Sequence, residues 1–396
     1  VSVDAYLDNG NTTPVDKRVV EAMEPYFTEK YGHPLFIYSK GKEAHTAVEE
    51  SKDYIAETVG AKGYSVTFTS GATEANDLAL RGVAKAKHTE GNHIITSNIE
   101  NPSVLRICEE LESEGFDVDY LEVDEDGFVD LNQLQKLVSE KTILASIGHV
   151  SGEIGTIQPI SKIGKIIRDE NPAVLFHSNA AASYGRVPID VREAGVDLLS
   201  ISAHKIHGPK GVGALISREG IDIEPVNYGY LSLSELRPGT ENVPGTVGFQ
   251  KAAELAFEDF ENKTEHIIGL RDRMMNGIEN SIPDVVLHGP KGKNRSPTNV
   301  NYSFKNIEGE SILMHLDARG ISVATGSACA TRKLEPSHVL TAIGVDPVVA
   351  HGAIRFTLSR TNTEEEIDYT LEVLPEVVEK LREMSPMKNG REEERE

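Results

Sequence analysis

The sequence predicts an α/β fold with a mostly parallel sheet and a second, smaller α/β domain. Helically spaced segments alternate between about residues 15 and 250 with seven short apolar runs, "SVTFTS", "HIITSN", "DVDYLEV", "TILASIGHV", "AVLFHS", "DLLSIS" and "GALIS". Strands separated by helices favour a parallel sheet that is covered on both faces. A long helical pattern over residues 248–280 follows and is a plausible connector between domains. Beyond it, further strands such as "NVNYSF" and "AIRFTLS" mix with helices.

The length of 396 residues also favours two domains over one core. We expect a large domain over residues 15–254. A small domain would combine residues 1–14 with residues 255–384. Residues 385–396 are strongly charged and are expected to form a disordered tail.

Composition narrows the possible functions. The formal charge of −23 disfavours direct binding to nucleic acid or to an anionic membrane. No apolar run is long enough to span a bilayer, and the first residues do not resemble a signal peptide. The two cysteines, Cys108 and Cys329, do not indicate a disulfide framework or a zinc site. We therefore expect a cytoplasmic protein, with Cys108 as an inert residue of an apolar helix face.

Two strand ends carry residues suited to a phosphorylated carbonyl cofactor. "TSGATEAN" places Thr73 at the start of a helix, where backbone N–H groups bind anions, although an ordinary helix cap explains the same pattern. "SISAHKIHG" places Lys205 directly after an apolar strand, beside Ser202 and His204. A partly buried lysine loses its charge and can form a Schiff base with a carbonyl group. An anion site and a reactive lysine together are what pyridoxal phosphate (PLP) needs.

Two further residues suggest substrate chemistry. Cys329 lies among small residues in "ATGSACATRK", and the cations Arg332 and Lys333 would favour its thiolate if the segment is exposed. Arg355, in "AIRFTLSR", is predicted at the end of a strand, and its guanidinium group suits a carboxylate, although a surface ion pair is the plainer alternative.

Taken together, these motifs resemble the NifS/IscS-like cysteine desulfurases among the fold-type I PLP enzymes. The resemblance runs from "YLDNGNTTPVD" to "RTNTEEEID", nearly the whole chain. Its most specific segments are "FTSGATEAN", "EIGTIQP", "DLLSISAHKIHGPKGVGAL", "RPGTENVPG", "GSAC" and "EPSHVL". It implies a homodimer that converts L-cysteine to L-alanine and passes sulfur to an acceptor protein.

The resemblance also implies a role for each matching residue. Lys205 would link to PLP, and Cys329 would carry the persulfide. Arg355 would hold the substrate α-carboxylate. The cofactor phosphate would be bound by Ala72, Thr73, Ser202, His204 and, from the other subunit, Thr240.

Several positions around the cofactor ring depart from the family pattern. Asn179 replaces the aspartate that pairs with the pyridine nitrogen, and a neutral amide cannot supply the charge that holds the ring proton. Asn101 replaces a histidine that stacks on the ring. Gly152 and Ala182 replace an asparagine and a glutamine that contact the cofactor.

Three functional interpretations follow. The first is a divergent but working desulfurase that serves iron–sulfur assembly or nucleic-acid thiolation or phosphorothioation. The second is a weakened or inactive relative that acts as a scaffold in a sulfur-transfer complex. The third is a PLP lyase that catalyses β-elimination. The joint retention of Lys205, Cys329 and Arg355 favours the first.

Overall fold

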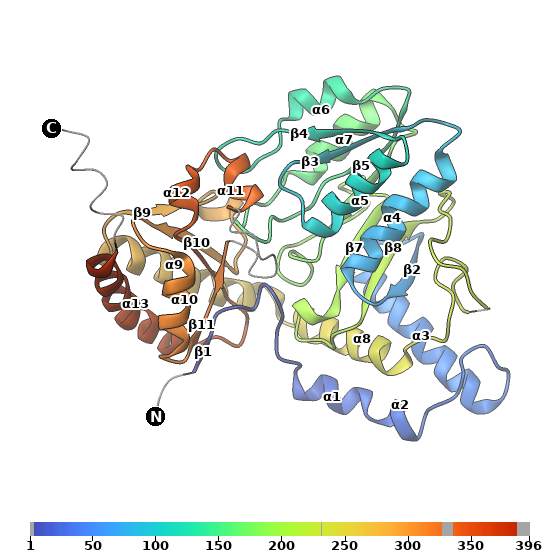
Figure 1. The fold of residues 1–396 in the computed structure, drawn as a ribbon. Helices are drawn as coiled ribbons and strands as arrows, with labels where there is room; N and C mark the ends of the chain where they lie inside the picture. The colour runs from blue at the N-terminus through green and yellow to red at the C-terminus, as the bar shows by residue number, and fades with distance from the viewer. Residues whose placement is uncertain (1–3, 231, 327–335, 386–396) are drawn as a thin grey trace.

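A computed structural model describes residues 4–230, 232–326 and 336–385. Its largest element is a seven-stranded sheet in the order β2-β8-β7-β6-β5-β3-β4 (Figure 1). Only β8 runs opposite to the other six strands, so the predicted mostly parallel sheet is confirmed. The strands are β2 (Tyr64–Thr69), β3 (His93–Ser97), β4 (Asp117–Leu121), β5 (Thr142–Ser146), β6 (Leu175–Asn179), β7 (Leu198–Ser202) and β8 (Gly213–Arg218).

Helices cover both faces of this sheet. One apolar layer lies between the sheet and helices α4 and α5, and a larger one lies on the other face beneath α3, α6, α7 and α8. The strands β3, β5, β6 and β7 are buried along their whole length, as expected for a sheet with two covered faces. The helices are α1 (Lys17–Met23), α2 (Pro25–Thr28), α3 (Ser39–Glu57), α4 (Ala72–Lys87), α5 (Pro102–Ser113), α6 (Leu131–Leu137), α7 (Ile160–Glu170) and α8 (Val243–Phe257).

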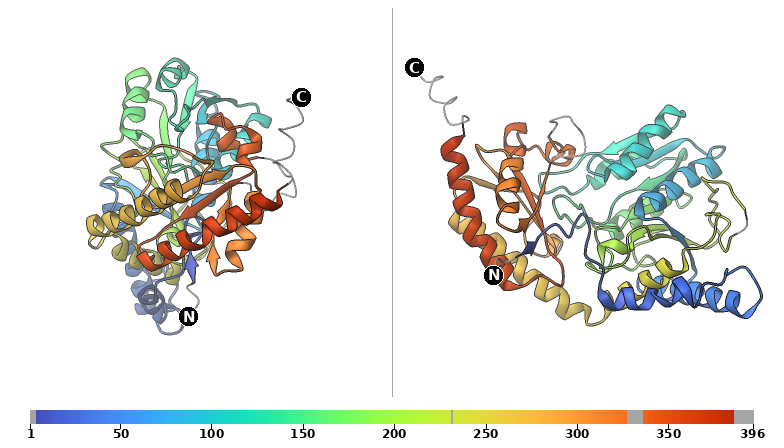
Figure 2. Two further views of the ribbon diagram at one scale, coloured as in Figure 1. Left: turned by 90° about the vertical axis from the view of Figure 1, so that its left-hand side faces the viewer. Right: turned by 60° about the horizontal axis from the view of Figure 1, so that its bottom comes forward.

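A second unit is built on a four-stranded antiparallel sheet with its own apolar core. The strands, in spatial order, are β12 (Ala324–Thr325), β13 (Ala353–Thr357), β10 (Asn299–Phe304) and β9 (Val285–Leu287). The helices are α9 (Phe260–Ser281), α10 (Gly309–Asp317), α11 (His338–Ala342), α12 (Pro347–Ala350) and α13 (Glu364–Met384). Figure 2 shows α13, in red, beside α9 on the outside of this unit.

The N-terminal segment joins this second unit rather than the large sheet. Strand β1 (Ala5–Tyr6) pairs in parallel with β11 (Ile321–Ser322), and it also lies against α13. The exact division at residues 254 and 255 stays a prediction.

The connector differs from the expected continuous helix. Helix α8 ends at Phe257 and α9 begins at Phe260, with Asp259 between them at φ 52°. This left-handed conformation interrupts helical hydrogen bonding, and aspartate is among the residues that tolerate it. The apolar spacing continues across the break, so the sequence pattern alone did not reveal it.

Candidate active site

The candidate site lies where the parallel strands of the large sheet end. Because β3, β5, β6 and β7 run in the same direction, the residues after them meet at one edge. A cavity of about 1250 Å³ opens there and is lined by Asn101, Asn179 and Lys205 from the large unit. Arg355 lines the same cavity from the middle of β13 in the small sheet, not from a strand end as predicted. The site is therefore shared between the two units.

Lys205 ends a single 3₁₀ turn, Ala203–Lys205, directly after β7. Its Nζ atom donates to the backbone carbonyls of Gly10 and Asn11, the second at 3.0 Å. Burial lowers the pKa of Lys205 to about 7, and the nearby charges of Arg186 and Arg355 act in the same direction. A substantial fraction of the amine is therefore neutral, and hence nucleophilic, near pH 7.

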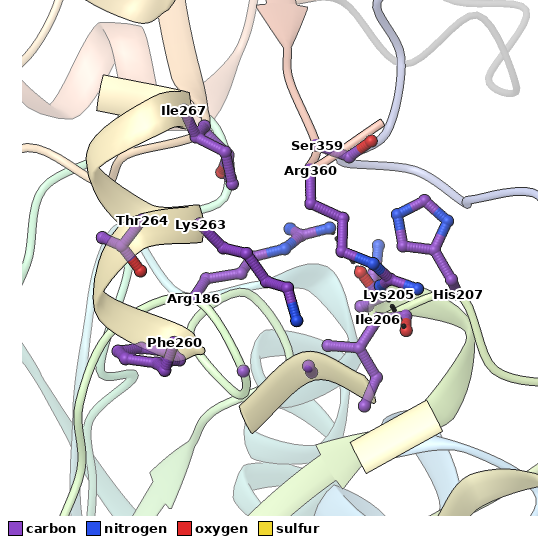
Figure 3. Close-up of a pocket in the computed structure, with 13 residues that line it drawn as sticks. Arg186, Lys205, Ile206, His207, Phe260, Lys263, Thr264, Ile267, Ser359 and Arg360 are labelled. Atoms are coloured by element: carbon purple, nitrogen blue, oxygen red, sulfur yellow. Dashed lines mark hydrogen bonds between the residues drawn. The ribbon is translucent and has the colours of Figure 1, made fainter. Parts of the chain in front are cut away.

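A second, smaller cavity lies behind the Lys205 backbone. Figure 3 shows Arg186, Lys263 and Arg360 reaching it from different parts of the chain. Its volume of about 30 Å³ suits a water molecule rather than a cofactor. The buried Arg186 side chain donates to the carbonyl oxygens of Lys205 and Asn9. These hydrogen bonds hold the Lys205 backbone in place.

The start of helix α4 offers a phosphate site beside Ser202. The Ser202 Oγ atom is buried and has no hydrogen-bond partner within the described part of the chain. A Cβ atom placed on Gly71, the residue before the helix, would lie 3.8 Å from it. Ala72 and Thr73 form the first turn of α4, where backbone N–H groups are free to bind an anion. An unpaired hydroxyl beside a helix N-terminus fits a phosphate group.

None of the residues predicted to bind the cofactor phosphate is among the described residues that line the large cavity, namely Ala72, Thr73, Ser202, His204 and Thr240. His204 contacts Thr12 through Nδ1 and Oγ1 at 3.3 Å, and burial and the Lys205 charge lower its pKa to about 4. Thr240 is exposed in the loop before α8. Cys329 lies outside the described residues.

Arg355 uses two of its five guanidinium N–H groups in hydrogen bonds to the described residues. Its Nη2 donates to Asn11 Oδ1 at 2.9 Å, and its Nη1 donates to the Gly152 carbonyl at 3.3 Å. Its Nε atom is buried and unpaired among the residues described. A guanidinium group held on two sides with an unsatisfied donor is suited to a carboxylate.

The residues that depart from the family pattern lie on this cavity wall. Asn179 Oδ1 accepts from the Ala181 backbone N–H at 3.1 Å. Asn101 Oδ1 accepts from Ser103 N at 3.0 Å and thereby caps helix α5.

Gly152 and Ala182 are neighbours on the same wall. A Cβ atom on Gly152 would lie 3.8 Å from the Ala182 Cβ atom. The two missing side chains therefore leave additional space at one place.

Two acidic residues of the cavity did not emerge from the sequence. Glu100 is 5% exposed, and burial raises the pKa of its carboxyl group to about 7. Its Oε1 accepts from Gly148 N at 2.8 Å and from Ser97 Oγ at 2.9 Å. Burial also raises the pKa of Glu153, which lies near Arg355. Their positions in the segments that follow β3 and β5 were the available signal, because parallel strands bring these segments to the same edge.

The fold and a buried lysine at the end of a parallel strand define the class of PLP-binding α/β enzymes. The sequence profile of the aminotransferase class-V family matches residues 5–370. The chain is 49% identical over 385 residues to cysteine desulfurase IscS from Dictyoglomus turgidum, covering 97% of each chain. A NifS-like protein structure aligns with a TM-score of 0.89 and 38% identity, over 96% of this chain and 100% of that one.

A structure described as SspA in complex with cysteine aligns with a TM-score of 0.77 and 33% identity, over 91% of this chain and 100% of the other. The chain belongs to the aminotransferase class-V family and, within it, to the cysteine desulfurases. Enzymes of this family depend on PLP. The unpaired Ser202 hydroxyl, the α4 N-terminus and the neutral fraction of Lys205 fit that cofactor.

No helix within the described ranges is long and apolar enough to cross a membrane.

Proposed function

We propose that this chain removes sulfur from L-cysteine, releases L-alanine and keeps the sulfur as a persulfide on Cys329. The observation that carries the proposal is the cavity shared by Lys205 and Arg355, in which an amine with a pKa of about 7 lies near a carboxylate-binding guanidinium group. A relative with a similar fold was solved with cysteine bound, which supports the same substrate class.

The site residues are assigned as follows. PLP, when bound, supplies an electron sink for the bond changes at the substrate amino acid. Ala72, Thr73, Ser202 and His204 would hold its phosphate, and Asn179 and Asn101 would lie beside its ring. Lys205 holds the cofactor and, as a neutral amine, moves the proton at the substrate Cα. Arg355 orients the α-carboxylate.

The sulfur-transfer step balances without an external oxidant. The thiolate sulfur of Cys329 forms an S–S bond with the substrate sulfur while the substrate Cβ–S bond breaks. The electron pair of that bond stays on the carbon side, and Cβ takes up a proton to become the methyl group of alanine. L-cysteine and the enzyme thiol thus give L-alanine and the enzyme persulfide.

The active form is proposed to be a homodimer that works in the cytoplasm and passes sulfur to an acceptor protein. Exposed apolar and aromatic side chains support the dimer. They include Ile37, which is 87% exposed, and Tyr230, which is 84% exposed. In such a dimer, Thr240 would complete the phosphate site of the partner subunit.

The residues that differ from the family pattern around the cofactor ring favour two alternative functions, a PLP lyase and a scaffold protein. The experiment must separate these from a desulfurase. Asn179 cannot supply a negative charge to the ring nitrogen, which weakens the electron sink. A PLP lyase would release pyruvate, ammonia and sulfide, and a scaffold protein would turn over nothing.

The test is to supply purified protein with PLP and L-cysteine and to quantify alanine, pyruvate and protein-bound persulfide. We expect alanine and a persulfide, with Cys329→Ala losing the persulfide but keeping the visible absorbance of the bound cofactor. Lys205→Ala should lose that absorbance maximum and the turnover. Pyruvate in place of alanine, or no turnover with PLP bound, would reject the desulfurase assignment.

A further inference from the structure

The motif "EIGTIQP" begins with a turn that forms hydrogen bonds with side chains of the small sheet. Asn299 Nδ2 donates to the Glu153 carbonyl at 3.0 Å, and Asn301 Nδ2 donates to the same carbonyl at 2.9 Å. Arg355 Nη1 donates to the adjacent carbonyl of Gly152. Two carboxamides and a guanidinium group from the small sheet thus bind two successive carbonyls of the large unit.

Strand register explains why these three side chains act together. In the antiparallel pair β10–β13, Asn301 lies directly opposite Arg355, and Asn299 lies opposite Thr357. Opposed residues project from the same face of a sheet, as do residues two apart on one strand. Asn299, Asn301 and Arg355 therefore share the face that meets residues 152 and 153.

The contact between the units is close and leaves little freedom. Gly155 has φ +79°, and a Cβ atom there would lie 2.8 Å from Asn299 Oδ1. Asn299 Oδ1 itself accepts from the buried Arg295 at 2.8 Å. The Gly155 carbonyl accepts from Ser296 N at 2.7 Å. The turn is therefore fixed to the small sheet on both sides of Glu153.

Three buried polar atoms around this contact have no partner among the described residues: Arg355 Nε, Asn301 Oδ1 and Glu153 Oε1. The Glu153 carboxyl group also lies within electrostatic range of Arg355. The Arg355 guanidinium group thus bonds Asn11 on one side and, on the other, the Gly152 carbonyl next to the carbonyl that Asn301 and Asn299 hold.

We propose that Asn301 is a positioning residue for substrate-carboxylate recognition. By binding the Glu153 carbonyl it fixes the neighbouring Gly152 carbonyl, which in turn orients the Arg355 guanidinium group toward the cavity. This inference rests on the carboxylate-binding role proposed above for Arg355. It assigns "EIGTIQP" the function of a docking turn that links the substrate site to the contact between the two units.

The test compares L-alanine with ethylamine, which is alanine without its carboxylate. Dissociation constants of both are measured on the PLP-loaded enzyme by titrating the visible absorbance of the bound cofactor. We expect Asn301→Ala to weaken L-alanine binding about tenfold, the loss of roughly one charge-assisted hydrogen bond, and to leave ethylamine unchanged. Equal losses for both ligands, or no loss for L-alanine, would overturn the proposal.

Two further variants keep the test decisive. Asn301→Leu retains a side chain of similar size, has no donor for the Glu153 carbonyl and adds no charge beside Arg355, and it should reproduce the selective loss if Asn301→Ala fails to fold. Ser303→Ala is the matched control, because Ser303 is buried on the same strand face and bonds His288 at 2.7 Å instead of the turn. It should leave the ratio of the two dissociation constants unchanged.

Arg355→Ala tests the carboxylate-binding role of Arg355 separately from the positioning role of Asn301. If it does not alter the preference for L-alanine over ethylamine, the role proposed for Arg355 is wrong and the inference about Asn301 is overturned with it. If Arg355→Ala removes the preference and the Asn301 variants do not, only the positioning role is rejected.

Discussion

Glu100 shows how burial changes the chemistry of a single residue. Its carboxyl group lies at the cavity with two hydrogen-bond donors on Oε1, from Gly148 and Ser97. These donors favour the charged form, but desolvation is the larger effect and the pKa rises to about 7. Near neutral pH this group is therefore partly protonated, unlike an ordinary surface glutamate.

This shift predicts a pH-dependent stability. Between the ordinary glutamate pKa and about 7, the folded state binds the Glu100 proton more tightly than the unfolded state. The stabilising contribution is full below the unfolded pKa and is lost as pH rises through about 7. Glu100→Gln imitates the protonated form, so at pH 8 it should be more stable than the parent protein by about 3 kcal/mol.

Urea unfolding at pH 5 and pH 8 measures this difference, which should fall to about 1 kcal/mol at pH 5. Glu110→Gln, on the exposed face of helix α5, is the control and should change little at either pH. Equal stability of Glu100→Gln and the parent protein at pH 8 would contradict the assigned shift.

At the scale of elements, close helix packing depends on glycines that the sequence does not distinguish. Gly164 lies in α7, where a Cβ atom would fall 2.0 Å from the Ala194 carbonyl oxygen. Gly269 lies in α9, where a Cβ atom would meet nothing within 4 Å. In the sequence, each of these glycines lowers the helix propensity of a helical segment in the same way. Only Gly164 is required for close packing.

The two alanine substitutions should therefore have opposite effects. Gly164→Ala forces α7 away from Ala194 and should lower the free energy of unfolding by about 1–3 kcal/mol. Gly269→Ala restricts the unfolded chain without a clash and should raise it by up to about 1 kcal/mol. Thermal unfolding followed by circular dichroism distinguishes them, and a shift of the same sign for both would refute the packing argument.

At the scale of the whole molecule, exposed aromatic side chains gather at the end far from the small unit. Phe36 and Tyr38 stack with ring centroids 5.6 Å apart in the loop between α2 and α3, on either side of the exposed Ile37 (Figure 1). Apolar groups that remain exposed together in one subunit mark an interaction site. The loop is therefore the place to test the proposed dimer.

Ile37→Asp should shift the protein from dimer to monomer in sedimentation velocity, because a charge in an apolar contact is costly to bury. Met314→Asp is the control, since Met314 is 70% exposed on α10 in the small unit. A dimer that survives Ile37→Asp, or a parent protein that is already monomeric, would argue against this loop as the interface.

Much of the fold could be predicted from the sequence because the signals are local. All seven strands of the large sheet were recognisable as apolar runs, and Lys205 was placed correctly at the end of one of them. The break at Asp259 was missed because one residue in a left-handed conformation does not disturb the apolar spacing.

What the sequence by itself determined is the order of strands and helices, the covered sheet, and the residue types that a PLP-dependent family requires. Only the tertiary structure placed Glu100 and Glu153 at the cavity and Asn301 opposite Arg355. The physical reason is range. Secondary-structure propensity and apolar periodicity act over a few residues. Burial, pKa shifts and hydrogen bonds between the two units depend on groups that are distant in the chain.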